Sequence, residues 1–357
     1  MKIKPMTKFA ILALSLVLVA CAGGGSEEAG CPAIDGREIN VVATTPMIGE
    51  FVSQVGGEKI NLTVLMPPEA NPHTYEPAPQ DAGTIAEADL VFYTGLLYEP
   101  AALVKLLENS ACSTDILSEV GESVFPIEFK EGGHDDHDDH DDHDDEEGHD
   151  DEEGHDDEEG HDDEEGHDDE EGHDDHEGHN HGAYDPHFWF DPSRVAYAAE
   201  YIESRLIEFD PENESSYKSS ADSFVSELND LTKQVSELIS TVPSQNRKLI
   251  TTHESLGYLE AKFGLEVLST IIPSLNSANE ISPSDLAGVI DVIEDNNVKV
   301  IFIESEAPSV YSETIVAETG IKSVTGLYVE TLKPGQSYSE FLISNVTLIT
   351  ENLQDTD

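Results

Sequence analysis

An acidic, histidine-rich tract divides the chain into two parts that could fold. The 357-residue sequence holds 76 acidic residues, and 30 of them lie between Glu131 and Gly182, where there is no Lys or Arg. From Gly148 onward the tract repeats Gly-His-Asp-Asp-Glu-Glu. Because residues 133–182 contain almost no apolar side chains, they cannot bury enough surface to offset the entropy lost on ordering. We therefore expect a disordered loop there, and a folded core built only from the two flanking parts.

The same tract holds most of the histidines. Imidazoles with neighbouring carboxylates suit divalent transition metals, so we expect an auxiliary metal-binding loop with several weak, exchangeable sites. The alternative is an acidic insertion that only increases solubility. Twelve of the fifteen histidines lie in the tract: His134, His137, His140, His143, His149, His155, His161, His167, His173, His176, His179 and His181.

The first residues indicate export and lipid anchoring. Three lysines among the first eight residues precede an apolar run at 9–19 that is too short to span a bilayer, which is typical of a secretory signal peptide. Leu18-Val19-Ala20-Cys21 resembles the lipobox of prokaryotic lipoproteins, in which the chain is cut before the Cys and the thiol is lipidated. We expect a signal peptide at 1–20 and a flexible tether at 21–37. The mature protein would be held outside the cytoplasm by the lipid on Cys21.

Cysteine content and charge narrow the chemistry further. Once Cys21 is set aside, Cys31 and Cys112 remain as two thiols in an oxidising compartment, which makes them candidates for a disulfide. The formal net charge of −59 makes nucleic acid and anionic membrane surfaces unsuitable partners. It suits a cationic ligand without specifying one.

Strands alternate with helices on both sides of the tract. This alternation is typical of parallel sheets covered on both faces by helices. We expect an N-terminal α/β lobe at 38–192 and a C-terminal α/β lobe at 244–357. In the first, the apolar spacing predicts strands at 39–44, 60–66 and 90–94 and helices at 47–55, 78–88 and 100–107. In the second, it predicts strands at 248–252, 265–271, 298–303 and 321–324 and helices at 258–262, 282–295, 310–319 and 338–353.

Two helices are predicted between the lobes, at 193–243. Asp191-Pro192 and Asp210-Pro211 each combine a capping side chain with a proline suited to the first helical turn. At about 1.5 Å per residue, the second helix, at 212–242, would be roughly 45 Å long. It is long enough to span both lobes.

Only three histidines lie outside the tract, and they are spread over about 180 residues. His73 and His253 each follow a predicted strand, and in parallel sheets ligands bind at the carboxyl ends of strands. His187 lies in Asp185-Pro186-His187, where Asp185 could accept a hydrogen bond from the imidazole and fix its tautomer. The alternative for His73 is a surface-loop histidine without a role. The loop at 326–331 places one carboxylate, Glu330, near the same crevice.

Several of these motifs together resemble the metal-binding solute-binding proteins of ABC transporters that import zinc or manganese. The resemblance implies two α/β lobes, each a parallel sheet flanked by helices, joined by one long rigid helix. The metal would be held between the lobes. The motifs are Asn71-Pro72-His73, the stretch from Asp89 to Glu99, Asp185-Pro186-His187-Phe188-Trp189, Thr252-His253-Glu254-Ser255-Leu256-Gly257-Tyr258, and the run from Ser282 to Ala307.

The resemblance implies a ligand set of His73, His187, His253 and a carboxylate. The family often has an Asp in the loop before the last helix, where this chain has Glu330. Glu330 is therefore the expected fourth ligand, and Glu254, Glu76 or a water molecule are the alternatives.

The predicted function is high-affinity binding of a divalent metal by a monomer and its delivery to a membrane permease. Three imidazoles and one carboxylate suit Zn²⁺, whereas Mn²⁺ usually has more oxygen ligands, so a manganese-binding protein of the same family is the alternative. A zinc-dependent hydrolase would need a general base such as Glu254, but no His-Glu-x-x-His motif accompanies it, and we expect no enzyme activity. A surface adhesin with a structural metal is a third interpretation.

Overall fold

The computed structural model describes residues 31, 34, 36–68, 70–129, 184–272, 283–305 and 310–354. The predicted signal peptide, Cys21 and the histidine tract lie outside these residues. Within the described ranges, no helix is both long enough and apolar enough to cross a membrane.

The first sheet has four parallel strands in the order β2-β1-β3-β4. Its strands are β1 (Ile39–Ala43), β2 (Ile60–Val64), β3 (Leu90–Tyr93) and β4 (Leu117–Glu119), and its helices are α1 (Pro46–Gly56), α2 (Pro79–Ala86) and α3 (Ala101–Ser110). The edge strand β4 was not predicted, because three residues are too few to show a period of two. The other elements lie where the sequence predicts them.

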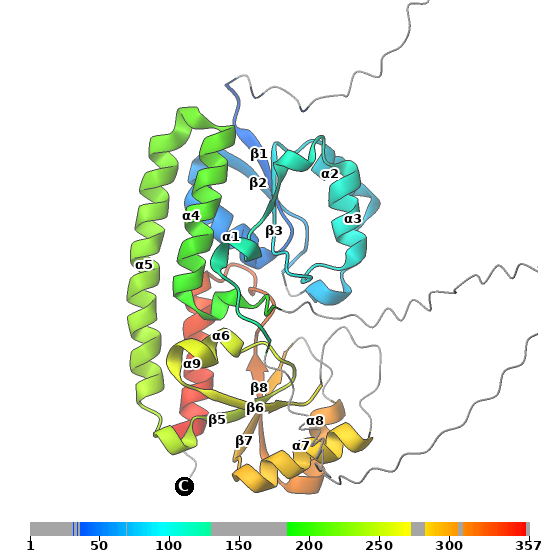
Figure 1. Ribbon diagram of the computed structural model, residues 1–357, viewed down its shortest axis with the longest axis vertical. Coiled ribbons are helices and arrows are strands. Elements are labelled where there is room, and N and C mark those ends of the chain that lie inside the picture. The colour runs from blue at the N-terminus through cyan, green and yellow to red at the C-terminus, as the bar shows by residue number, and fades with distance from the viewer. Residues whose placement is uncertain are drawn as a thin grey trace, which may run out of the picture.

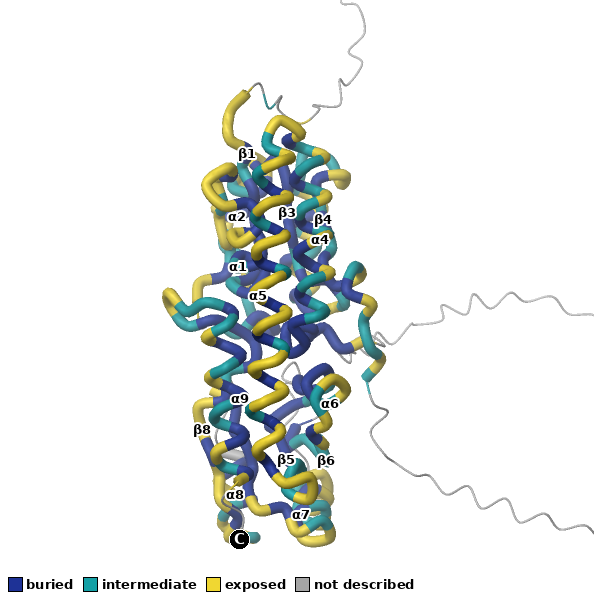
Figure 2. The backbone as a smooth tube through the Cα atoms, turned by 90° about the vertical axis from the view of Figure 1, so that its left-hand side faces the viewer, coloured by how far each residue is buried: buried dark blue, intermediate teal, exposed yellow. Residues whose placement is uncertain are grey.

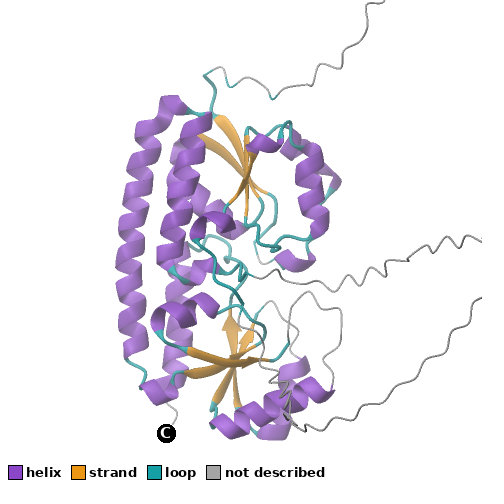
Figure 3. Ribbon diagram, viewed as in Figure 1, coloured by secondary structure: helices purple, strands orange, loops and turns teal. Residues whose placement is uncertain are grey.

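The second sheet repeats this topology. Its order is β6-β5-β7-β8, again with every pair parallel. Figure 3 shows the strands of both sheets in orange with helices beside them. Its strands are β5 (Lys248–Thr251), β6 (Glu266–Thr270), β7 (Val300–Glu304) and β8 (Lys322–Leu327), and its helices are α6 (Gly257–Phe263), α7 (Pro283–Asn296), α8 (Val310–Thr319) and α9 (Tyr338–Gln354).

Two long helices lie between the sheets in sequence. In α4 (Pro192–Phe209), the Asp191 side chain caps the first turn by accepting a hydrogen bond from the backbone N–H of Ser193, at 2.8 Å. A 3₁₀ turn at Pro211–Asn213 then precedes α5 (Glu214–Ser240), which is 27 residues long, so α5 begins two residues later than predicted. At about 1.5 Å per residue, α5 is about 40 Å long.

Helix α5 joins the two lobes (Figure 1). It packs against α1 and α4 in the first lobe and against α6 and α9 in the second. In Figure 2, α5 faces the viewer, and its turns alternate between buried and exposed residues. Its buried residues follow the three- and four-residue spacing of an amphipathic helix. They are Tyr217, Ala221, Phe224, Leu228, Leu231, Val235 and Ile239. The fold class predicted from the sequence is confirmed.

A single hydrophobic cluster runs through both lobes. Side chains alternate across each strand, so one face of each sheet packs on this shared core and the other on a local core. In β3, Leu90 and Phe92 face the shared core, while Val91 faces the local core under α2 and α3. In β7, Phe302 faces the shared core and Ile301 the local core under α7 and α8. The lobes are therefore parts of one packed body.

Two further contacts hold segments at the limits of the described ranges. Cys31 and Cys112 form a disulfide with Cα atoms 5.1 Å apart, which links the start of the described chain to the end of α3. Glu128 and Tyr184, the residues near each side of the tract, form an isolated antiparallel bridge. The chain thus leaves and re-enters the fold at one point.

Because the shared core is continuous, we expect Leu231→Ala in α5 to destabilise both lobes together. Leu231 is buried, and a Leu→Ala change in a core lowers the free energy of unfolding by about 2–5 kcal/mol. Urea denaturation would be followed by circular dichroism and by fluorescence of Trp189, the one tryptophan in the sequence. The two signals should shift to lower urea concentration together. The exposed control Ser226→Ala should change stability by no more than about 0.5 kcal/mol, and separate transitions for the two signals would contradict a shared core.

Candidate metal centre

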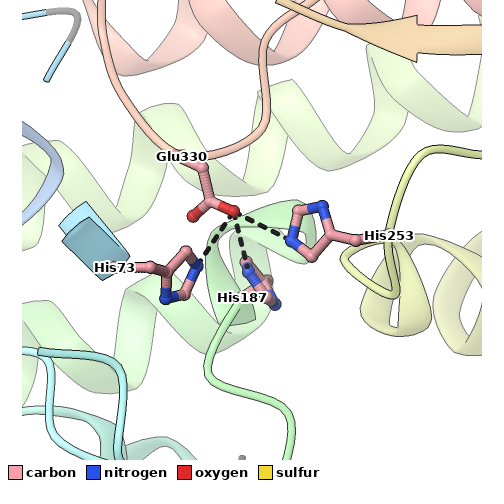
Figure 4. Close-up of side chains that lie close together, drawn as sticks. All are labelled: His73, His187, His253 and Glu330. Carbon is pink, nitrogen blue, oxygen red and sulfur yellow. Dashed lines mark hydrogen bonds and ion pairs between the residues drawn. The ribbon is translucent and has the colours of Figure 1, made fainter. Parts of the chain in front are cut away.

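Four buried side chains meet between the lobes (Figure 4). His73 lies in the 3₁₀ turn Pro72–Thr74 that follows β2, and His187 directly precedes the turn Phe188–Phe190. His253 follows β5, and Glu330 follows β8. Three of the four therefore lie beyond the carboxyl ends of parallel strands, as the sequence predicts.

The three imidazoles of this group converge on one oxygen atom of the fourth residue, Glu330. Oε1 of Glu330 lies 3.2 Å from Nε2 of His73, 3.4 Å from Nε2 of His187 and 2.9 Å from Nε2 of His253. Around a tetrahedral metal with bonds of about 2.0 Å, neighbouring donors lie about 3.3 Å apart. The three distances from Oε1 match edges of such a tetrahedron, and all four ligand atoms lie within 4.8 Å of one another.

Asn71 and Pro72 position His73. The side-chain oxygen of Asn71 accepts a hydrogen bond from the backbone N–H of His73 at 2.9 Å, and Pro72 occupies the first position of the turn. Proline fixes its own φ and Asn71 caps the turn, so the backbone that carries this imidazole is well defined.

Asp185 positions His187, as the sequence predicts. Its Oδ1 accepts a hydrogen bond from the backbone N–H of His187 at 2.9 Å and lies 2.7 Å from the ring Nδ1. With the proton on Nδ1, the lone pair of Nε2 is directed at the centre. A Cβ on Gly257 would meet Oδ2 of Asp185 at 2.6 Å, so only glycine lets the start of α6 approach this carboxylate.

Glu304 supports His253, and the sequence interpretation missed this role. The Glu304 carboxylate accepts a hydrogen bond from the backbone N–H of His253 at 3.2 Å and also contacts the ring Nδ1. The Ser255 hydroxyl donates to the same carboxylate at 3.3 Å. A signal was present, because Glu304 ends the strand next to β5 and so lies at the same sheet edge as His253.

Glu330 is held by residues of the first lobe and of the connecting segment. The Tyr98 hydroxyl donates to Oε2 of Glu330 at 2.9 Å and lies 3.1 Å from its backbone carbonyl. The indole N–H of Trp189 donates to the carbonyl of the preceding Val329 at 2.8 Å. Tyr98 was likewise not singled out from the sequence, although it too follows a strand end.

When no metal is bound, the charged groups of the centre shift one another's pKa values. Burial acts to lower the pKa of His187, but the negative charge of Glu330 and the hydrogen bond to Asp185 outweigh it and raise that pKa to about 9. Burial likewise opposes a charged His253, yet Glu304 and Glu330 raise its pKa well above the usual value. Burial acts to raise the pKa of Glu330, whereas the neighbouring His73 and His187 hold it well below its ordinary range. A bound cation would take the place of these protons.

The donor set fits a divalent transition metal. The Nε2 atoms of His187 and His253 are buried and make no well-formed hydrogen bond. Buried polar atoms are normally satisfied, so two such nitrogens beside a buried carboxylate are suited to a metal ion. Of the alternatives for the fourth ligand, Glu76 is exposed and Glu254 half-buried, and neither joins the group that the described residues form.

Comparison with known sequences gives one family over most of the chain. Residues 41–352 match the family model described as zinc-uptake complex component A, periplasmic (ZnuA). The high-affinity zinc uptake system protein ZnuA of Bacillus subtilis is 27% identical over 355 residues, covering 97% of this chain and 96% of that protein. The manganese ABC transporter substrate-binding lipoprotein PsaA of Streptococcus anginosus is 25% identical over 360 residues, covering 98% and 99%.

Comparison with solved structures supports the same fold. The periplasmic zinc-binding protein TroA of Treponema pallidum superimposes with a TM-score of 0.68 at 20% identity, covering 88% of this chain and 99% of that one. The Fe(III)-bound YtgA of Chlamydia trachomatis has a TM-score of 0.66 at 22% identity, covering 88% and 98%. The fold of this chain is thus similar to that of proteins named for different metals.

We expect Glu304→Gln to weaken metal binding at this centre by about 10–100-fold, because it removes the charge that orients His253 and raises its basicity. Zn²⁺ affinity measured by competition with a chelator would test this. Glu266→Gln, an exposed change on the edge strand β6 of the same sheet, is the matched control and should bind as the wild type does. Equal affinities in the two variants would show that Glu304 does not support the centre.

Proposed function

This chain belongs to the family of periplasmic zinc-uptake complex components A, and on that basis we propose that it captures a divalent metal outside the cytoplasm and delivers it to an ABC importer permease. The observation that carries the proposal is the buried group of His73, His187, His253 and Glu330 between the lobes. Its metal is the cargo of the protein. A metal held by side chains of both lobes can be released when the lobes move relative to one another.

The donor chemistry favours Zn²⁺ as the cargo. The relatives include proteins named for zinc and for manganese, so the family alone leaves both metals open. Three imidazole nitrogens and one carboxylate oxygen form a donor set typical of zinc, whereas Mn²⁺ sites are richer in oxygen. The centre of this chain contains one carboxylate at the ligand positions.

The geometry favours binding over hydrolysis. A catalytic zinc site keeps one coordination position for water or substrate and places a base beside it. Here the fourth position is taken by Glu330, whose second oxygen accepts a hydrogen bond from Tyr98.

Two segments outside the described residues complete the proposal. The lipobox-like sequence at Cys21 would anchor the protein to the membrane, in keeping with the relatives named lipoproteins. The histidine tract would act as an auxiliary loop that binds further metal ions weakly. Neither role depends on the geometry of the centre.

We predict that replacing any one of His73, His187 or His253 with Ala sharply lowers high-affinity Zn²⁺ binding, because a four-coordinate site must fill the lost position with water. Affinity would be measured by chelator competition and stoichiometry by elemental analysis of the purified protein. Wild-type affinity in all three variants would overturn the proposed centre. Glu330→Ala should weaken binding as well.

A deletion of residues 133–182 distinguishes metal binding at the centre from metal binding by the tract. We expect the deletion variant to keep one tight site at near wild-type affinity and to lose several weak sites, because a flexible chain gives up conformational entropy whenever it wraps an ion. Isothermal titration would resolve the two classes. If the tight site disappears with the tract, the tract histidines are the primary ligands and the centre is not.

Anchoring is tested by Cys21→Ser. Without a thiol to lipidate, the protein should move from the membrane fraction to the soluble fraction, while its Zn²⁺ affinity stays the same. Immunoblots of fractionated cells give the distribution. A variant that remains in the membrane fraction would contradict lipidation at this residue.

A further inference from the structure

A loop in an unfavourable backbone conformation leads from β3 to the centre. Gly95, Leu96 and Leu97 have φ angles of 76°, 53° and 60°, which lie in the left-handed region. Residues other than glycine adopt this region rarely and at an energetic penalty. Residues held in this region are concentrated at functional sites. Leu97 is also 63% exposed, so burial of its side chain does not explain the conformation.

Two carboxylates hold this loop in place. Glu99, itself buried, accepts hydrogen bonds from the backbone N–H groups of Thr94 at 2.7 Å and Gly95 at 2.9 Å. Glu119, at the end of β4, accepts one from the N–H of Leu96 at 2.8 Å. Hydrogen bonds to charged acceptors are stronger than those between neutral groups, so they offset the strain of the loop.

The loop delivers Tyr98 from the first lobe to a ligand of the second. The Tyr98 side chain is buried, and its ring lies edge-on to His73 and Trp189, with centroids 5.0 and 5.3 Å apart. Its hydroxyl donates to Oε2 of Glu330. The two oxygens of Glu330 are therefore used differently, because Oε1 faces the three imidazoles and Oε2 is held by the tyrosine.

We propose that Tyr98 is a positioning residue that sets metal specificity, by restricting Glu330 to a single ligating oxygen. This inference rests on the proposed function of the centre. A carboxylate that offers one oxygen completes a four-coordinate set with three imidazoles, which suits Zn²⁺. Mn²⁺ favours more oxygen ligands and would gain from both oxygens of Glu330, but Oε2 would first have to give up its hydrogen bond.

The test is Tyr98→Phe, which removes the hydroxyl and keeps the ring. We expect the ratio of Mn²⁺ to Zn²⁺ dissociation constants, each measured by chelator competition, to fall by about 10-fold relative to the wild type. The Co²⁺ form supplies a readout of coordination, since four-coordinate Co²⁺ absorbs visible light more strongly than six-coordinate Co²⁺. Its visible band should weaken in the variant.

The matched control is Tyr217→Phe. Tyr217 is also buried and its hydroxyl also donates to a carboxylate, that of Asp210 at 2.6 Å, but it lies at the start of α5 away from the centre. It should leave both the ratio and the Co²⁺ spectrum unchanged.

The outcomes are distinct. An unchanged ratio in Tyr98→Phe, or equal weakening of Zn²⁺ and Mn²⁺ with the Co²⁺ spectrum preserved, would overturn the role of Tyr98 in specificity. Either result would leave the proposed function intact as long as the wild type binds Zn²⁺ tightly, which the same experiment measures. Absence of a tight site in the wild type would instead overturn the proposed function, and this inference with it.

Discussion

The structure depends on burying one carboxylate, Glu330, among three imidazoles. Removing a charge from water is very unfavourable unless the charge is paired and hydrogen-bonded, so this group can exist only where partners are fixed on every side. The surrounding residues supply them: Asp185 and Glu304 hold the far sides of two rings, and Tyr98 holds the second oxygen of Glu330. Each of these partners comes from a different part of the chain, so the centre is complete only when the lobes are docked.

Because the two lobes share one hydrophobic core, they are docked together as soon as the chain is folded. Helix α5 packs on both lobes, and the cluster that includes Phe188, Trp189 and Phe190 continues from the first sheet to the second. Trp189 also anchors the loop before Glu330 through its indole N–H, and Tyr338 donates its hydroxyl to the Trp189 carbonyl at 2.7 Å. Ligands on such a frame lose little freedom when a metal binds.

Much of the fold follows from sequence periodicity, and the limits of that prediction have physical reasons. The alternation of strands and helices, the long α5 and the three isolated histidines are all local patterns, and the carboxyl-edge rule of parallel sheets places His73 and His253 at the same crevice. Glu304 and Tyr98 were missed because their roles depend on which strands are neighbours and on which lobe faces which. Strand β4 was missed because it is short. The sequence favoured Glu330 but left Glu254 and Glu76 open, and among the described residues only Glu330 of these three joins the buried group.

The bridge between Glu128 and Tyr184 has a consequence for how such a chain can change over generations. The two residues meet at the base of the insertion, so the folded body is closed before the tract begins. The composition of the tract predicts a loop for which each doubling of length adds only about 0.6 kcal/mol to the entropic cost of closure. The number of Gly-His-Asp-Asp-Glu-Glu units can therefore expand or contract by replication slippage with little effect on the stability of the lobes. The length of the tract can evolve independently of the metal centre.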